Sequence, residues 1–144
     1  MAQTEKKRSK GFTLIEVLIG MALVGIAVLG LAEMFTLAVL QNRQADRIAN
    51  ATFLAQQQID AMRNMTQTEI AAWAGIPFDE PLDLNADGVN DYRRITAVLN
   101  TGTLWDIRVL VFSAEHMATD MDELVADPQG HKVRSQIQTL ISSR

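Results

Sequence analysis

An almost uninterrupted apolar run near the N-terminus dominates the sequence. Residues 11–40 read GFTLIEVLIGMALVGIAVLGLAEMFTLAVL, and between Phe12 and Leu40 only two threonines and two glutamates are polar or charged. At a helical rise of about 1.5 Å per residue, roughly twenty such residues cross the ~30 Å hydrocarbon core of a bilayer. The stretch therefore predicts a membrane-spanning helix, and Glu16 is a costly residue inside it.

Charge is divided unevenly around this run. Residues 1–11 hold four Lys or Arg and one Glu, a net charge of +3, whereas residues 12–144 carry −7 and the whole chain −4. A cationic flank stays on the cytoplasmic side, which places the C-terminal body outside the cytoplasm. No basic face follows the leader, so no nucleic acid contact is predicted. The chain has no Cys, which excludes disulfides and thiol chemistry.

A cleaved secretory signal is the alternative for this segment. Such signals have an apolar core of about 7–15 residues followed by an A-x-A-like site, and the run here is roughly twice that length. No A-x-A ends it, and the small residue Gly11 precedes the apolar core instead. We therefore expect a single-pass anchor that stays attached to one exported body.

Nothing in the sequence stops the helix at the membrane edge. No Pro occurs before Pro77, and no Gly occurs between Gly30 and Gly75. After the run, apolar residues return at helical spacings, at Leu40, Ala51, Leu54, Ala55, Ile59 and Met62. A helix over residues 12–65 would be on the order of 80 Å long, with an amphipathic second half that needs a packing partner.

The C-terminal half supplies this partner as strand-like runs. Residues 68–91 are a turn-rich connection, and the acidic residues 117–130 are expected to form a second, solvated loop. Runs that partly alternate apolar with polar residues lie at 92–100, 103–115 and 131–142. Asn100-Thr101-Gly102 is a turn signal, which predicts a hairpin of the first two runs. The expected fold is α+β, with the distal half of one long N-terminal helix packed on an antiparallel sheet of about three strands.

The N-terminal residues resemble a known processing motif. The stretch Lys10-Gly11-Phe12-Thr13-Leu14-Ile15-Glu16-Val17-Leu18 is similar to the N-terminal cleavage and methylation motif of type IV pilins and type II secretion pseudopilins. The shared features are a basic leader, a Gly at the cut, an aromatic first mature residue, a Glu at the fifth mature position and a long apolar helix. The expected helix-then-sheet order extends this resemblance loosely to a pilin-like architecture of the whole chain.

The resemblance implies a role for each of these residues. A prepilin peptidase would cut between Gly11 and Phe12, the new amino group of Phe12 would be N-methylated, and Glu16 would contact the amino terminus of a neighbouring subunit during assembly. The implied partners are other pilins or pseudopilins through the N-terminal helix, the prepilin peptidase and an inner-membrane assembly platform. The implied location is the bacterial inner membrane, with a cytoplasmic N-terminus and a periplasmic C-terminal domain, and later a pilus or pseudopilus.

Elementary electrostatics supports the same role for Glu16. An intramembrane carboxylate is by default functional and paired, because leaving it unpaired costs several kcal/mol. Cleavage after Gly11 creates a cation, which can lie beside a neighbour's Glu16 in a staggered helix bundle. The alternative is a Glu16 that snorkels to the interface or is protonated.

The helix sequence looks most like minor pilins of the pilus-modification (PilV-like) kind, with I-type minor pseudopilins close behind. The helix-bending Pro that major pilins often carry near the position of Glu33 is missing, which argues against a bulk filament subunit. The resemblance therefore implies a structural subunit, not an enzyme, that primes or modifies assembly of a type IV pilus. The alternatives are a minor pseudopilin of a type II secretion system, and a membrane-anchored periplasmic binding domain that never polymerises.

These segments give the expected domain organisation. Residues 1–11 are a leader that is removed, and residues 12–40 are the transmembrane or filament-core helix. Residues 41–65 continue this helix amphipathically, and residues 66–144 form a periplasmic sheet domain with a loop at 79–91.

One loop of that domain carries oxygen atoms at metal-ligand spacing. The candidate ligands are Asp83, Asn85, Asp87, the carbonyl of Val89, and Asp91. Gly88 allows the sharp turn, but Arg94 stands where an EF-hand has its bidentate Glu, so the loop resembles the shorter calcium loops of extracellular modules. We expect that the chain requires no cofactor, with Ca²⁺ as a candidate ligand of this loop. The alternative is an Asx-rich turn.

No catalytic constellation is recognisable in the sequence. The two histidines, His116 and His131, lack the spacing of a metal pair and are expected to be solvated or hydrogen-bonded. No phosphate loop and no Ser-His-Asp order occurs in the chain.

Overall fold

The computed structural model describes residues 11–143, and one helix accounts for more than a third of them. This helix, α1 (Leu14–Arg63), is 50 residues long, so the helix predicted over residues 12–65 is confirmed to within two residues at each end. By its contacts the chain forms two units, residues 1–43 and residues 44–144. The first unit contains the apolar part of α1, and the second contains the rest of α1 and the sheet.

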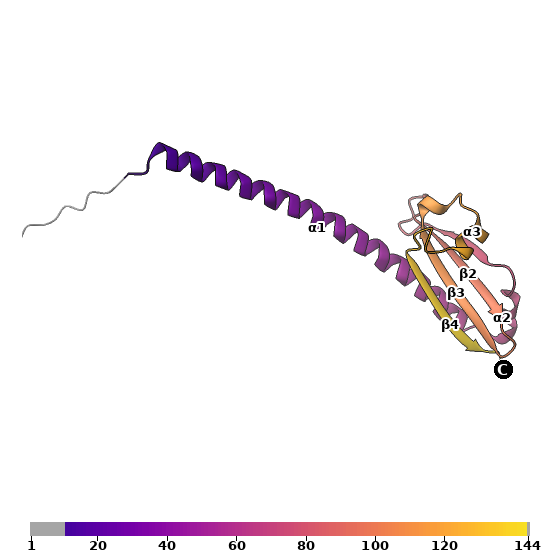
Figure 1. The fold of residues 1–144 in the computed structure, drawn as a ribbon. Helices are drawn as coiled ribbons and strands as arrows, with labels where there is room; N and C mark the ends of the chain where they lie inside the picture. Colours follow the sequence, from indigo (N-terminus) through magenta and orange to yellow (C-terminus); the bar gives the residue numbers. More distant parts are fainter. Residues whose placement is uncertain (1–10, 144) are drawn as a thin grey trace, which may run out of the picture. The chain divides into compact units, whose positions relative to one another are not determined.

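The sheet of the second unit has four antiparallel strands in the order β1-β2-β3-β4 (Figure 1). Their bounds are β1 (Phe78–Leu82), β2 (Tyr92–Asn100), β3 (Leu104–Ser113) and β4 (Ser135–Ser142). The hairpin predicted at Asn100-Thr101-Gly102 joins β2 to β3. Gly102 has a φ of 91° and its N–H donates to Asn100 Oδ1 at 2.7 Å, so the turn uses the residues that the sequence indicates.

Two connections that were expected to be irregular contain regular structure. Residues 68–91 were predicted as a turn-rich connection, but the segment includes most of α2 (Gln67–Ala72) and all of β1, which raises the strand number from about three to four. The loop predicted at 117–130 includes α3 (Met121–Ala126), and the 3₁₀ helix η1 (Ala114–His116) precedes it. Both α-helices are capped by side chains, which explains how such short segments become helical.

A capping box fixes the start of α2. Thr66 accepts the backbone N–H of Glu69, and Glu69 in turn accepts the backbone N–H and the hydroxyl of Thr66 at 2.7 and 2.8 Å. These hydrogen bonds, the backbone bond first, hold the pKa of the Glu69 carboxyl below its usual range. Gln67 joins α2 to the sheet, because it accepts Trp105 Nε1–H at 2.6 Å and donates to the carbonyl of Ser142 at 2.6 Å.

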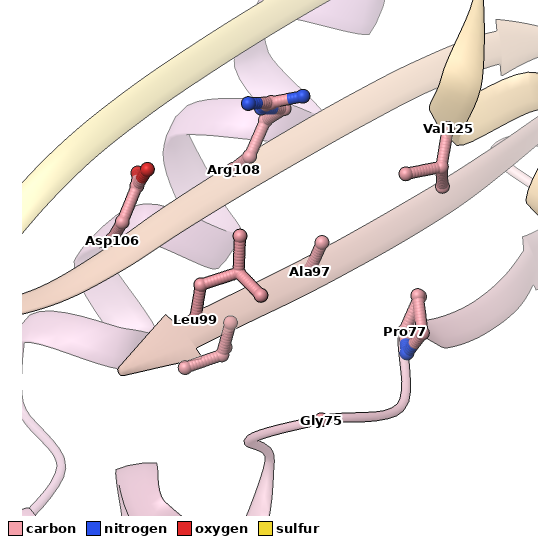
Figure 2. A pocket seen from close by; sticks show the side chains of 8 residues that line it. Gly75, Pro77, Ala97, Leu99, Asp106, Arg108 and Val125 are labelled. Atoms are coloured by element: carbon pink, nitrogen blue, oxygen red, sulfur yellow. The ribbon is translucent and has the colours of Figure 1, made fainter. Parts of the chain in front are cut away.

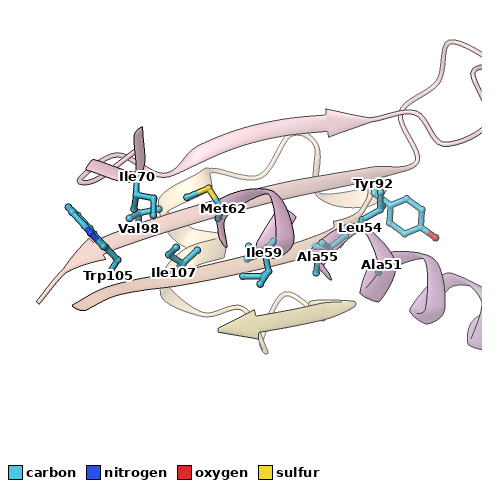
Figure 3. Packing of buried hydrophobic residues seen from close by; sticks show 12 residues of the cluster. Ala51, Leu54, Ala55, Ile59, Met62, Ile70, Tyr92, Val98, Trp105 and Ile107 are labelled. Carbon is cyan, nitrogen blue, oxygen red and sulfur yellow. The ribbon is translucent and has the colours of Figure 1, made fainter. Parts of the chain in front are cut away.

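The main core lies between the distal part of α1 and one face of the sheet (Figure 3). The residues of α1 that are buried there are Ala51, Leu54, Ala55, Gln58, Ile59 and Met62. Five of the six periodic apolar positions predicted to need a partner are in this set, whereas Leu40 is 55 % exposed. The sheet contributes alternate residues of β2 and β3, as expected for strands with one face on a helix.

The opposite face of the sheet carries a smaller core. Ile95, Leu110 and Phe112 are fully buried there against Leu124 of α3. The strands β2 and β3 are therefore covered on both faces, which is why their sequences alternate only in part.

Two adjacent arginines connect the edge strand β1 to the two faces. Arg93 binds Asp79 through two hydrogen bonds and donates to the carbonyls of His116 and Thr119, each at 2.6 Å. Because neighbouring strand residues point to opposite faces, the next residue, Arg94, reaches the α1 side.

On that side, Arg94 pairs with Glu80 and donates to the carbonyl of Leu54 in α1 at 3.1 Å. Both arginine side chains are at least nine-tenths buried. Charged hydrogen bonds of this kind hold β1 in place despite its Pro81.

We expect Ile59→Ala to lower the free energy of unfolding by about 2–4 kcal/mol, because Ile59 is 3 % exposed and its removal leaves a cavity in the main core. The matched control is Phe53→Ala on the same helix, where the side chain is 62 % exposed and the change should stay within about 0.5 kcal/mol. Urea unfolding of the full chain in detergent, followed by tryptophan fluorescence, measures both. Equal effects of the two substitutions would contradict the burial pattern of α1.

Candidate functional site

The first unit presents an apolar helix with no protein partner. Every residue from 11 to 50 is exposed, and among the most exposed are Phe12 at 81 % and Leu14 at 83 %. An 18-residue window of α1 has a mean hydropathy of 2.5, so α1 is long and apolar enough to cross a membrane. A surface of this size requires an apolar environment, which is either lipid or other apolar helices.

Glu16 occupies the first turn of α1. The helix begins at Leu14, and the N–H of Glu16 lies 3.1 Å from the carbonyl oxygen of Thr13 and 3.4 Å from its hydroxyl oxygen. Thr13 and Glu16 therefore have the spacing of an N-terminal cap and its third helical residue. A negative charge at this place is favourable toward the helix dipole, so Glu16 has a local role in addition to any contact between subunits.

One hydroxyl and three glycines of the apolar segment suit an apolar environment. The hydroxyl of Thr36 donates to the carbonyl of Ala32 at 3.0 Å, which satisfies it within the helix. A Cβ added at Gly20, Gly25 or Gly30 would meet nothing within 4 Å, so these glycines leave room for close approach of another helix. The predicted leader, except for Gly11, lies outside the described residues.

The loop after β1 is closed by its own oxygen side chains. Asp83 Oδ2 accepts the N–H of Gly88 at 2.7 Å, and Asp91 Oδ2 accepts the N–H of Leu84 at 3.0 Å. Asn85 and Asp87 form the turns between them, with Asn85 Oδ1 accepting the N–H of Asp87 at 3.1 Å. These are the hydrogen bonds of an Asx-rich turn, which was the alternative to a calcium loop.

Two features of this loop go beyond the turn. Asp83 Oδ1 is buried and has no hydrogen-bond partner in the described part of the chain. Ala86 has a φ of 58°, a left-handed conformation that costs a non-glycine residue energy, and Gly88 has a φ of 86°. Oxygen atoms at 83, 85, 87 and 91 suit a hard cation such as Ca²⁺. Across residues 11–143, however, no group of three His, Cys, Asp or Glu is placed to hold a metal.

The fold brings together two histidines whose spacing in the sequence predicts no contact. The rings of His116 and His131 are 5.8 Å apart and nearly perpendicular, and His131 Nε2 lies 3.3 Å from Glu123 Oε1. His116 also contacts the ring of Phe112 edge-on. They are 15 residues apart in the chain, so no short spacing could have indicated this contact.

A shallow apolar pocket lies on the sheet face that carries the smaller core (Figure 2). Its lining includes Ala97, Leu99 and Val125, with Asp106 and Arg108 at its side. Its volume of about 120 Å³ is below the several hundred Å³ of typical small-molecule sites.

The comparison with protein families gives a match at the N-terminus. Residues 6–32 match the family described as the prokaryotic N-terminal methylation motif, and the matched stretch contains Gly11, Phe12 and Glu16. The comparisons with curated proteins and with solved structures give no significant match. The motif is type IV pilin-like and points to a structural subunit rather than an enzyme, with association between pilins and prepilin peptidase processing.

Proposed function

We propose that this chain is a minor pilin-like structural subunit that primes or modifies assembly of a type IV pilus. The observation that carries this proposal is the methylation motif at residues 6–32. The motif overlaps the start of the continuous helix α1, whose distal part packs on the sheet in a pilin-like α+β architecture. The N-terminus faces the cytoplasm before processing, and the sheet unit lies in the periplasm. The alternative is a minor pseudopilin of a type II secretion system, in which Gly11, Phe12 and Glu16 would have the same roles.

Processing changes the charge of the N-terminus at the point where the helix begins. A prepilin peptidase hydrolyses the bond between Gly11 and Phe12, which removes four cationic side chains with the leader and creates an amino group on Phe12. N-methylation keeps that amine basic. Four strongly hydrated cations would be expensive in a filament core, whereas one amine has a partner available.

That partner is Glu16 of a neighbouring subunit. Apolar contacts along residues 12–40 are non-directional and tolerate sliding of one helix along another. A charge pair between the Phe12 amine and Glu16 of the next subunit selects a single register, because any other register leaves two charges unpaired in an apolar core. Apolar packing thus supplies association, and the charge pair supplies the stagger.

We further propose that the loop at 83–91 binds Ca²⁺ in the periplasm. The buried Asp83 Oδ1 that lacks a partner supports this, because a cation would satisfy it. The residues that would hold the ion are Asp83, Asn85, Asp87, Asp91 and the carbonyl of Val89. A bound ion would stiffen the connection between β1 and β2.

Replacing Gly11 by a bulky residue such as Leu should block removal of the leader, because the peptidase has to approach the bond after Gly11 closely. The expected result is a chain that stays in the membrane at its unprocessed mass. Mass spectrometry of the mature amino terminus measures this and, for the wild type, should show N-methylated Phe12. The matched control is Gly20→Leu, which should be processed normally. A wild-type chain with an intact leader would favour the non-polymerising anchor.

The charge of Glu16 is tested by Glu16→Gln. Gln keeps the size and polarity of the side chain but removes its charge, and with the charge both the favourable interaction with the helix dipole and the pairing with an amine. We expect processing to be normal and incorporation into filaments to fall about tenfold or more, which corresponds to ~1.4 kcal/mol of lost attraction. Glu33→Gln in the same helix is the control and should incorporate as the wild type does. Normal incorporation of Glu16→Gln would restrict Glu16 to its local role.

Calcium should raise the melting temperature of the sheet unit. At 10 mM Ca²⁺, a site with the affinity usual for extracellular modules adds roughly 1.5–2.5 kcal/mol, or about 5–15 °C for a unit of this size. Scanning calorimetry of the full chain in detergent, with Ca²⁺, Mg²⁺ or EDTA, measures the shift. Asp83→Asn should abolish it, whereas Asp122→Asn, an exposed acid outside the loop, should leave it intact. A wild-type shift below 1 °C at this concentration would leave the loop as an Asx-rich turn.

A further inference from the structure

The two edges of the sheet differ in how they are protected. Edge strands are usually short, charged, bulged or interrupted by Pro, which prevents them from pairing with other chains. The edge strand β1 follows this rule, since its five residues include Asp79, Glu80 and Pro81. The other edge strand, β4, reads SQIQTLIS, which is eight residues with no charge and no Pro.

The register identifies the backbone groups of β4 that point outward. The N–H of Ser143 donates to the carbonyl of Thr103 at 3.0 Å, and hydrogen-bonded pairs alternate along an antiparallel ladder. By the register of β3 and β4, the residues of β4 that bond to β3 are Ile137, Thr139 and Ile141. The residues whose N–H and C=O groups face the open edge are then Gln136, Gln138 and Leu140. Ser142 is a separate case, because its carbonyl accepts Gln67 Nε2–H.

The side chains of β4 are also incompletely covered. Ile137 and Ile141 pack against the main core but are only partly buried, and between them the hydroxyl of Thr139 accepts a hydrogen bond from Arg63 of α1 at 3.4 Å. On the other face, Leu140 is 60 % exposed. No strand in the described part of the chain pairs with the outer side of β4 (Figure 1).

We propose that β4 accepts an extended strand from a different subunit of the same filament. This inference rests on the proposed function, because it requires the chain to assemble. Main-chain hydrogen bonds to Gln136, Gln138 and Leu140 provide the affinity, as in other cases of strand addition. The occupant is an extended segment whose side chains on the α1 side are apolar beside Ile137 and Ile141, which completes their cover, and polar beside Thr139, to which Arg63 donates.

A second copy of this chain fits the edge less well. Its β1 edge is blocked by Pro81 and by acids already paired with Arg93 and Arg94. If the β4 strands of two copies paired antiparallel, the copies would be related by a two-fold axis. The α1 segments 51–62 of the two copies would then run in opposite directions. Subunits drawn from one membrane share a single direction.

Hydrogen exchange of the intact, processed chain tests the proposal. In detergent, the amides of Gln136, Gln138 and Leu140 should exchange quickly, while those of Ile137, Thr139 and Ile141 are slow. In purified filaments, the three fast amides should slow by about 100-fold or more. Unchanged rates in filaments overturn the proposal. Protection that rises with the concentration of the purified chain alone also overturns it, since a second copy then occupies the edge.

A pair of variants separates the backbone from the side chain at position 138. Both Gln138→Pro and Gln138→Ala remove the side-chain hydrogen bonds to Asp106, but only Pro removes the outward N–H. Pro is tolerated where an edge N–H faces solvent, so both variants should fold and lose their leader as the wild type does. Incorporation into filaments should fall about tenfold for Pro relative to Ala. Equal incorporation of the two overturns the proposal.

A second pair of variants covers the case in which Gln138→Pro does not fold. Leu140→Lys places a charge at the open edge, whereas Leu99→Lys places one at a similarly exposed position, 57 %, on the inner strand β2. Only Leu140→Lys should reduce incorporation, and equal effects overturn the proposal. Leader removal and methylation of Phe12 are read in the same samples. A processed chain that assembles without protection of β4 refutes strand addition alone, whereas a chain that is never processed refutes the proposed function.

Discussion

The apolar surface of residues 12–40 is the constraint on which the rest of the molecule depends. Nothing in the described part of the chain covers it, so it has to lie in lipid or among other helices. A carboxylate on such a surface is acceptable only where it is capped, hydrated or paired. In this chain Glu16 stands in the first turn, three residues after Thr13, and it is the fifth residue after the bond at which we propose cleavage. The desolvation cost of the Glu16 carboxylate therefore arises at the end of the helix, where the proposed cleavage would create a cationic amino group on Phe12.

The second unit uses the same helix for a different purpose. From residue 51 onward, α1 presents one apolar stripe to the sheet, and this stripe is the principal core of the unit. The buried Arg94 reinforces the attachment, since it contacts a carbonyl of α1 and a carboxylate of β1 at once. A single continuous helix thus gives an assembling surface in its first half and a folded unit in its second half. No Pro occurs within residues 14–63, and the helix is continuous between these bounds.

The sequence is informative wherever a single segment decides the outcome. Hydrophobic periodicity, the absence of Pro before Pro77 and the absence of Gly between Gly30 and Gly75 predict α1 to within two residues at each end. Alternation bounded by turn residues predicts β2 with its correct ends. The sequence does not predict β1, because FDEPL has the composition of a loop. The strand is held by the ion pairs of Asp79 and Glu80 with Arg93 and Arg94 of the neighbouring strand, which are distant in the sequence. The capping box of Thr66 and Glu69 was readable and would have predicted α2. The contact of His116 with His131 and the open edge of β4 depend on the arrangement of strands, so no local pattern can reveal them.

The candidate functional features also differ in how far the sequence predicts them. The motif could be recognised from the sequence, because it depends on residue order along one chain, and the family match over residues 6–32 agrees with it. What the motif cannot specify is how a subunit is recognised among others that carry the same N-terminus, since apolar helices pack with little selectivity. Selectivity then has to come from the second unit, and its two sheet edges are unequal. The protected β1 edge excludes pairing, while the uncharged β4 edge offers three outward backbone positions and two half-covered isoleucines. A strand added there would distinguish one neighbour from another, which the shared helix alone cannot do.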